Sequence, residues 1–321
     1  MNNEDAWLHR YSILVAYCVL LVLIAGAVVT SLERPISPVP SAPSTPVAIS
    51  FESWHRLGAI FVAVLIAGLA VWLARAGKDH RLRQVGWIVL SIFVMEGLLG
   101  MALGSPSPLG DILHALIGPI SFASAASINV FTSERWKRGP NFVEDSWRPP
   151  LRKLAFFLPA IVTLQIVLGA AFRYRAASVI WHILNAMIVL LSILIVCVFL
   201  VRQFPEHPSL RPAAIALGGI TAVQVFLGFT TFVMLLLFPE SSPAVIIVSV
   251  VHVATGALTL AATVSLAAEI RRNVVDVRSL TVSDRDVTGG NDRVTQSFGR
   301  LGTDVNLVRH HPNVGDCVTV K

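Results

Sequence analysis

Eight apolar runs, each about 20 residues long, constrain this chain more than any other feature of its sequence. A helix of that length matches the hydrocarbon core of a bilayer, which is about 30 Å thick. Lipid offers no hydrogen-bond partners to the backbone, so such runs cross the membrane as helices. The runs cover approximately residues 12–31, 54–73, 85–103, 110–131, 154–172, 178–201, 213–238 and 244–269.

The composition agrees with eight spans. The chain has 321 residues, of which 55% are hydrophobic and 14% charged, and its mean hydropathy is +0.71. The runs use most of the chain and leave no room for a folded soluble domain. The first run is too long for a signal-peptide core and lacks a cleavage site, so we keep it as a span. We therefore expect an all-α integral membrane protein with eight transmembrane helices.

Lys and Arg are concentrated in alternate connections between the runs. The rich connections are 74–84, 132–153 and 202–212, joined by Arg271 and Arg272 after the last run. By the positive-inside rule these segments are cytoplasmic, so we expect both termini inside a multi-pass protein of the cell (plasma) membrane. The formal net charge of +6 is then explained by topology, and we expect no nucleic-acid partner.

A short motif recurs in the odd-numbered runs, with a polar residue four positions before a glycine. The pairs are Glu96 with Gly100, Gln165 with Gly169 and Gln224 with Gly228, and the first run retains only Gly26. Each half has an even number of spans, so the repeat is parallel, about an axis along the membrane normal. We expect two pseudo-symmetric four-helix bundles, residues 1–153 and 154–272, followed by a disordered polar tail, 273–321.

A histidine lies near the start of every even-numbered run: His55, His114, His182 and His252. An ionisable side chain inside lipid is costly and is retained mainly where it has a function. Imidazole is a common ligand of haem iron. The even-numbered runs cross from outside to inside, so all four histidines are expected at one depth, in the outer half of the membrane. Two pairs of such histidines predict two haem sites.

A small residue follows each histidine by four positions, one turn deeper on the same helix face. These residues are Ala59, Gly118, Ala186 and Gly256. A flat macrocycle held by the histidine needs such a notch, so we expect them to contact the cofactor. Small residues also allow membrane helices to pack closely, and the sequence leaves that alternative open.

Acidic residues distinguish the two halves. Glu52 precedes His55 by three positions and shares its helix face, where its carboxylate is available for proton transfer. Alternatively, Glu52 only complements the positive N-terminus of its helix. Asp111 holds the same place before His114, whereas neither histidine of the second half has such an acid. We therefore expect the first pair to carry the chemistry and the second to carry electrons.

A haem in this chain is expected to be held without covalent attachment. No CxxC or CxxCH motif occurs around any of the three cysteines. Arg56, Arg173 and Arg175 lie at the outer interface. Their guanidinium groups either pair with haem propionates or extend to lipid headgroups, and both interpretations stay open.

These features resemble the heme A synthase family over about residues 12–270. That family has eight spans in two four-helix halves and a histidine in each even span. Its second span opens with a Glu-x-x-His motif, matched here by Glu52-Ser-Trp-His55-Arg56. The stretches LQIVLGAAFR (164–173) and HVATGAL (252–258) are similar to segments of its fifth and eighth spans. The first outer loop departs from the family, because it lacks the Pro-Asp-Trp-Pro signature and the cysteine pair of many bacterial members.

The resemblance implies oxidation of the C8 methyl group of haem O to a formyl group, which gives haem A for cytochrome oxidase. It implies that His55 and His114 flank the substrate haem, with Glu52 as an essential acid. It also implies that His182 and His252 hold a haem b that relays electrons. The expected partners are a haem O synthase, a membrane or soluble electron donor and the lipid bilayer; homo-oligomerisation is left open.

Other functions would use the same four histidines. A dihaem b-type protein that passes electrons from quinol to an acceptor gives Glu52 no essential role. A haem chaperone or transporter predicts loosely bound haem and no turnover. A divergent paralogue of the family would keep the fold and change the product.

Overall fold

The protein is a bundle of long helices with one short pair of strands. The structure, a computed structural model, describes residues 3–33, 46–75, 80–102, 107–145 and 148–276. The helices are α1 (Asn3–Glu33), α2 (Pro46–Arg75), α3 (His80–Ala102), α4 (Pro108–Thr132), α5 (Glu134–Lys137), α6 (Leu151–Arg173), α7 (Val179–Gln203), α8 (Leu210–Leu237) and α9 (Pro243–Asn273), and the strands are β1 (Val143–Asp145) and β2 (Val274–Asp276). Within the described residues, eight helices are long and apolar enough to cross a membrane, which confirms the predicted all-α membrane fold.

Several helices are longer than the apolar runs that predicted them. Helix α1 begins at Asn3 and α2 at Pro46, each well before its run. Hydropathy marks only the part of a helix that lies in hydrocarbon, whereas the backbone ladder continues into the headgroup region. Glu52 consequently lies inside α2 and not at its beginning.

Serine caps define where two of the histidine-bearing helices begin. Ser107 accepts a hydrogen bond of 3.4 Å from the backbone N–H of Gly110, and Pro108 follows at the first helical position. Ser178 accepts one of 3.3 Å from the N–H of Ile180. Both arrangements satisfy donors that a helix N-terminus would otherwise leave unpaired. The caps therefore fix α4 and α7 relative to their loops, and with them the histidines that follow.

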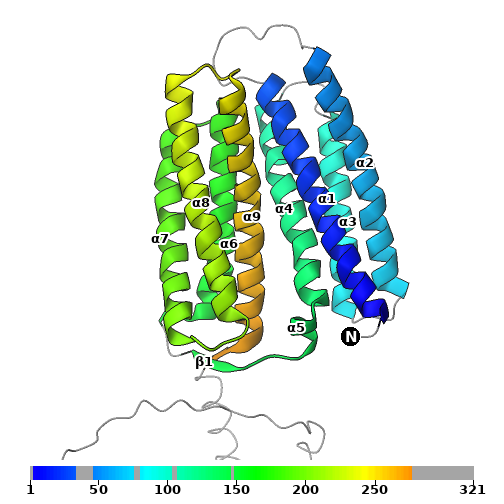
Figure 1. The fold of residues 1–321 in the computed structure, drawn as a ribbon, viewed down its shortest axis with the longest axis vertical. Helices are drawn as coiled ribbons and strands as arrows, with labels where there is room; N and C mark the ends of the chain where they lie inside the picture. The colour runs from blue at the N-terminus through cyan, green and yellow to red at the C-terminus, as the bar shows by residue number, and fades with distance from the viewer. Residues whose placement is uncertain (1–2, 34–45, 76–79, 103–106, 146–147, 277–321) are drawn as a thin grey trace, which may run out of the picture.

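The spanning helices form two four-helix bundles that lie side by side (Figure 1). Helices α1 to α4 contact one another in a closed cycle, and α6 to α9 do the same. Between the bundles, α1 contacts α9, α4 contacts α9, and α4 contacts α6. In the repeat, α1 corresponds to α6 and α4 corresponds to α9. The contact between α1 and α9 therefore corresponds to the contact between α6 and α4, and the contact between α4 and α9 corresponds to itself. The interface therefore has the pseudo-two-fold relation expected for a parallel repeat.

Helices α4 and α9 form the centre of the molecule. Their buried residues include Ala123 and Ala125 on α4 and Ala257 and Ala261 on α9. Small side chains let membrane helices approach closely, where van der Waals contacts replace the missing hydrophobic drive. This packing joins the two halves along the core.

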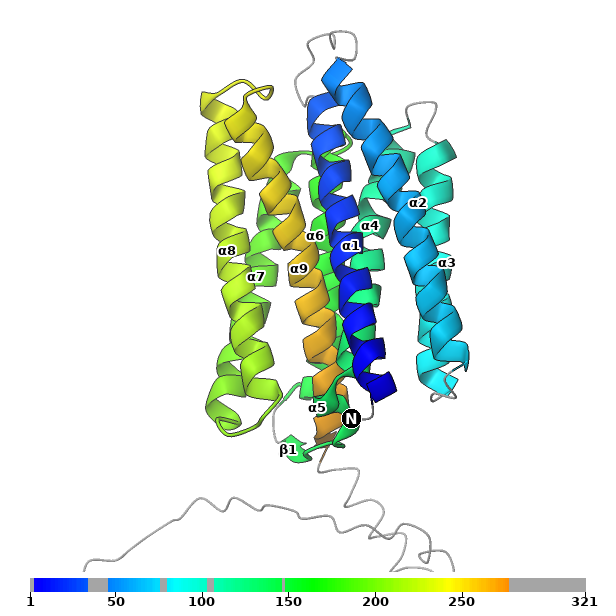
Figure 2. The ribbon, with the colours of Figure 1, turned by 45° about the vertical axis from the view of Figure 1, so that its right-hand side comes forward.

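The described ends of the chain lie at one end of the bundle, as an even number of spans requires (Figures 1 and 2). Strand β1 pairs there in parallel with β2, with Val143 opposite Val274. Asn273 Oδ1 accepts a hydrogen bond of 2.9 Å from the N–H of Asn141. The tail predicted to be disordered, 273–321, is therefore ordered over its four described residues: Asn273 ends α9 and 274–276 form β2, because both are tied to the segment around β1. The rest of it lies outside the described residues.

Candidate functional site

Each of the four predicted iron ligands packs its ring against a glycine of the preceding helix. The pairs are Gly26 with His55, Gly100 with His114, Gly169 with His182 and Gly228 with His252. A Cβ added to these glycines would lie 2.9, 3.2, 3.0 and 3.0 Å, respectively, from the ring Cε1 atom. Contacts this short leave no space for a side chain, so glycine allows each ring to approach the neighbouring helix.

A backbone carbonyl of the preceding helix orients the first of these rings. His55 Nδ1 lies 3.1 Å from the carbonyl oxygen of Val22, four residues before Gly26. When Nδ1 carries the proton and donates it here, Nε2 keeps a free lone pair. Metal-binding histidines commonly use such an outer hydrogen bond to set the tautomer and the ring orientation.

The side-chain amide of Gln165 lies against the ring of His182 and donates to its backbone carbonyl. Its Nε2 lies 3.1 Å from the ring Nδ1 and 3.2 Å from the ring Nε2, and it donates to the His182 carbonyl at 3.0 Å. Its Oε1 accepts a hydrogen bond of 2.8 Å from Asn185 Nδ2. The polar residue of the repeated motif therefore has a structural task, which is to position a histidine without bringing in a charge.

The histidines of the second half face each other across their bundle. The ring centres of His182 and His252 are 6.4 Å apart, and the ring planes are inclined at 80°. Two imidazoles that share one metal ion, each with its nitrogen about 2 Å away, have ring centres about 6 Å apart. His182 and His252 would therefore be the residues that hold a haem iron bound between their rings.

Buried polar atoms beside His252 lack hydrogen-bond partners. His252 Nδ1 forms no hydrogen bond of ordinary geometry, although the backbone of Gln224 is close enough to act on the ring. The Oε1 atom of Gln224 is also buried without a hydrogen-bond partner. Such atoms are infrequent in folded proteins and often mark a place where another group binds. The His252 side of the pair therefore offers two unpaired polar atoms to a group that binds there.

Two of the predicted notches are filled by polar side chains of the preceding helices. A Cβ at Gly118 would lie 2.9 Å from Glu96 Oε1, and one at Gly256 would lie 3.3 Å from Gln224 Nε2. Glycine at these places thus has a helix-packing cause that does not need a macrocycle. Contact with a cofactor stays a prediction for the other two small residues, which are half-buried: Ala59 and Ala186.

Glu52, the predicted catalytic acid, forms an ion pair with Arg56 on the same helix. The Glu52 side chain is 37% exposed and that of Arg56 66%. Glu52 lies beyond the first turn of α2, so the helix N-terminus is too far away to be its main partner. An exposed pair of this kind adds little stability. It does hold the carboxylate near the end of the bundle that carries the histidines.

Arg173, a predicted propionate partner, bridges the two halves. It ends α6, and its Nη2 donates to the carbonyl oxygen of Thr30 near the end of α1 at 3.0 Å. This contact uses one of the five guanidinium donors. Arg175 follows with a positive φ of 58° and is exposed. The arginines therefore lie at the histidine end of the molecule, and their contact with haem propionates stays a prediction.

Sequence reasoning assigned no role to one acidic residue inside a span, Glu96. Its Oε2 accepts a hydrogen bond of 2.8 Å from Ser121 Oγ on α4. In the repeated motif, Glu96 occupies the same position as Gln165 and Gln224. The motif groups these residues as polar and does not separate the acid from the two amides. The available signal was that an ionisable group within an apolar span is a functional candidate by default.

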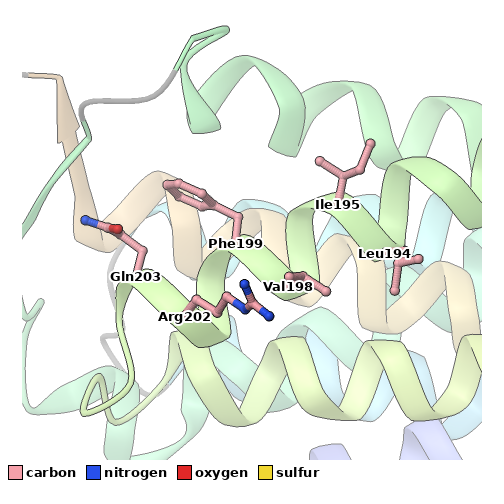
Figure 3. A pocket seen from close by; sticks show the side chains of 6 residues that line it. All are labelled: Leu194, Ile195, Val198, Phe199, Arg202 and Gln203. Atoms are coloured by element: carbon pink, nitrogen blue, oxygen red, sulfur yellow. The ribbon is translucent and has the colours of Figure 1, made fainter.

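An open groove of about 470 Å³ lies along α7, away from the histidines (Figure 3). Its lining residues are Leu194, Ile195, Val198, Phe199, Arg202 and Gln203. Leu194 follows His182 by about three helical turns, so the groove lies toward the other end of the bundle. It is not part of the candidate site.

The candidate site is built from histidine pairs and not from a compact metal cluster. Within the described ranges, no group of three or more His, Cys, Asp or Glu side chains could hold a bare metal ion. Haem iron needs only axial ligands from the protein. Compared with models of protein families and with curated proteins, the sequence matches none.

Proposed function

We propose that this protein is a haem-dependent membrane oxidoreductase of the heme A synthase type, which oxidises the C8 methyl group of haem O to a formyl group. The observation that carries the proposal is the His182–His252 pair, with ring centres 6.4 Å apart. The same packing of histidine on glycine recurs at His55 and His114. The recurrence of this packing in the first half supports a protein with two haems.

The second half serves electron transfer in this proposal. His182 and His252 would bind haem b without covalent attachment, and Gln165 holds the first of them through its hydrogen bond to the His182 carbonyl oxygen. Haem iron with two histidine ligands changes oxidation state without binding a substrate.

The first half binds the substrate haem between His55 and His114. Haem supplies the redox chemistry when it is bound. The chain's own residues would position it and accept protons: the Val22 carbonyl orients His55, and the Glu52 carboxylate, held by its ion pair with Arg56, would be the proton acceptor. General acid–base groups of this type contribute on the order of 100-fold to 10,000-fold in rate.

The proposed location is the cell membrane, with both termini in the cytoplasm. The distribution of Lys and Arg supports this orientation. It puts all four histidines and the Glu52–Arg56 pair in the outer half of the bilayer. A haem O synthase would supply the substrate, and a separate donor would supply electrons.

Extraction of haem from the purified protein, after co-expression with a haem O synthase, tests the proposal. We expect haem A together with haem b in the wild-type preparation. A His114→Ala variant should keep haem b and lose haem A, because only the substrate site is altered. Haem b alone in the wild type, with haem O available, would reject the assignment.

A dihaem b-type electron-transfer protein is the second candidate. The observation that favours it is the ion pair of Glu52 with Arg56, which accounts for this acid without catalysis. This candidate predicts that both histidine pairs hold haem b. It also predicts full electron transfer from quinol in a Glu52→Ala variant.

A further inference from the structure

Glu96 is an acidic side chain at membrane depth with a defined orientation. It lies within the predicted span of α3, on the face that also carries the buried residues Val89 and Phe93. The following face of the same helix, with Val94 and Met95, is exposed. The carboxyl group is therefore turned into the first bundle and not toward lipid.

Helix α4 is shaped to receive this carboxyl group. Ser121 Oγ donates to Glu96 Oε2 at 2.8 Å, and Oε1 lies 2.9 Å from the position that a Cβ would take on Gly118. A glycine four residues beyond one histidine provides the space, and a hydroxyl seven residues beyond it provides the donor. That histidine is His114, so the carboxyl lies about one turn, or roughly 6 Å along the helix axis, deeper than the predicted ligand.

Within the part of the chain that the structure describes, no ion pair involves Glu96, so no cationic side chain balances its charge. The helices packed against α3 are α2 and α4. Their titratable and charged groups at this end are Glu52, His55, Arg56, Asp111 and His114. A lone carboxylate in lipid is expensive, so its charge has to be balanced by a proton or by a group bound in the site.

The second half has no counterpart to this charge. The equivalent positions of the repeated motif hold the amides Gln165 and Gln224. An amide keeps the hydrogen-bonding capacity of the side chain and removes the ability to exchange a proton. The packing of histidine on glycine thus recurs in both predicted haem sites, while the motif position carries an ionisable group in the first half alone.

We propose that Glu96 is a positioning residue that balances charge in the first site by exchanging one proton. This inference rests on the proposed function, because it requires a redox group between His55 and His114. When that site gains one electron from the haem of the second half, the Glu96 carboxylate takes up one proton from water. When the site loses the electron, the carboxyl returns the proton, and the net charge of the site is unchanged.

The test is a redox titration of the full-length protein in detergent. The titration is monitored by the absorbance of the haems and is repeated at several pH values. Two haems are first assigned by their loss in His114→Ala and His182→Ala variants. We expect the reduction potential of the His114-dependent haem to fall as the pH rises. The slope should be that of a reaction in which one proton is taken up for each electron. The Glu96→Gln variant should abolish that dependence, and the second haem should be unaffected in both proteins.

Two further variants make the outcome specific. Glu96→Asp keeps an acid and should retain the pH dependence, which separates proton exchange from a packing role. Gln224→Glu is the matched gain-of-function control, and it should give the second haem a pH-dependent potential. A pH-independent potential in the wild type, or an unchanged slope in Glu96→Gln, would overturn the inference while leaving the proposed function standing. Absence of a His114-dependent haem would instead overturn the proposed function, and this inference with it.

Discussion

The smallest recurring unit in this protein is a histidine ring placed against a glycine. The added Cβ positions lie within 3.2 Å of a ring atom in all four cases, so no larger residue fits without moving the ring. The residue one turn before the glycine then holds or borders the site, as Val22, Gln165 and Glu96 do in different ways. Two residue types on neighbouring helices thus set where each imidazole can lie.

Replacing Gly228 by alanine should displace the ring of His252, because the new Cβ would lie 3.0 Å from Cε1. Overpacking of this kind costs about 1–3 kcal/mol, so haem should be retained on the order of 10-fold less tightly. The measurement is haem content per protein after purification. Gly219→Ala on the same helix is the control, since nothing lies within 4 Å of an added Cβ there. Equal haem content in the two variants would contradict the packing argument.

Replacing Glu52 by alanine should leave haem bound and block haem A formation, since the carboxylate is not an axial ligand. We expect haem O to accumulate in the variant. Glu52→Asp should also be impaired, because a displacement of about 1 Å can cost on the order of 100-fold in rate. Arg56→Gln breaks the same ion pair but keeps the acid, and it should retain more activity than Glu52→Ala. Haem A at the wild-type rate in Glu52→Ala would leave this residue with only its ion pair.

At the scale of elements, helices work in adjacent pairs. An odd-numbered span supplies the glycine and the motif residue, and the next span supplies the histidine. The diagonal helices α7 and α9 then bring two histidines to a separation of 6.4 Å between ring centres. The site therefore depends on four helices at once, although only two carry the ligands.

Replacing either His182 or His252 by alanine should remove a low-spin haem spectrum, because one axial ligand is lost. Folded yield should fall as well, since a bound ligand stabilises the folded state by mass action. Absorbance spectra and gel filtration of the two variants provide the measurement. Asn185→Ala, which removes hydrogen bonds to Gln165 and to the Ile161 carbonyl but no predicted iron ligand, should keep most of the haem. Wild-type haem content in both histidine variants would refute the assignment.

At the scale of the whole molecule, the two bundles meet through α4 and α9 and are tied together at both ends. Arg173 reaches Thr30 at the histidine end, and β1 pairs with β2 at the opposite end. A rigid connection of this kind would keep two cofactors at a fixed separation, which electron transfer between them requires. The described termini lie together at the end remote from the histidines.

The orientation of the molecule can be checked with reporter fusions. A reporter that is active only outside the cytoplasm should be inactive when fused at the C-terminus, because Lys and Arg concentrate on that side. The same reporter fused after Ala176, between α6 and α7, should be active. The reverse pattern would place the histidines near the cytoplasm and would overturn the proposed topology.

Sequence alone determined the spans, the histidines that they carry and the repeat that relates the two halves. These features depend on local composition and spacing, because composition sets the length of each helix and spacing sets which residues share a helix face. Contacts between spans did not follow in the same way. Helices that are apolar all round carry almost no amphipathic signal, so their rotation is set by packing.

Tertiary structure therefore decided what each motif contacts. It set histidine rings on Gly26, Gly100, Gly169 and Gly228, and it filled the notches at Gly118 and Gly256 with side chains. It also paired Glu52 with Arg56 and turned Glu96 toward Ser121. Each of these contacts requires two helices at a particular depth and rotation, and that relation is created only when the whole bundle packs.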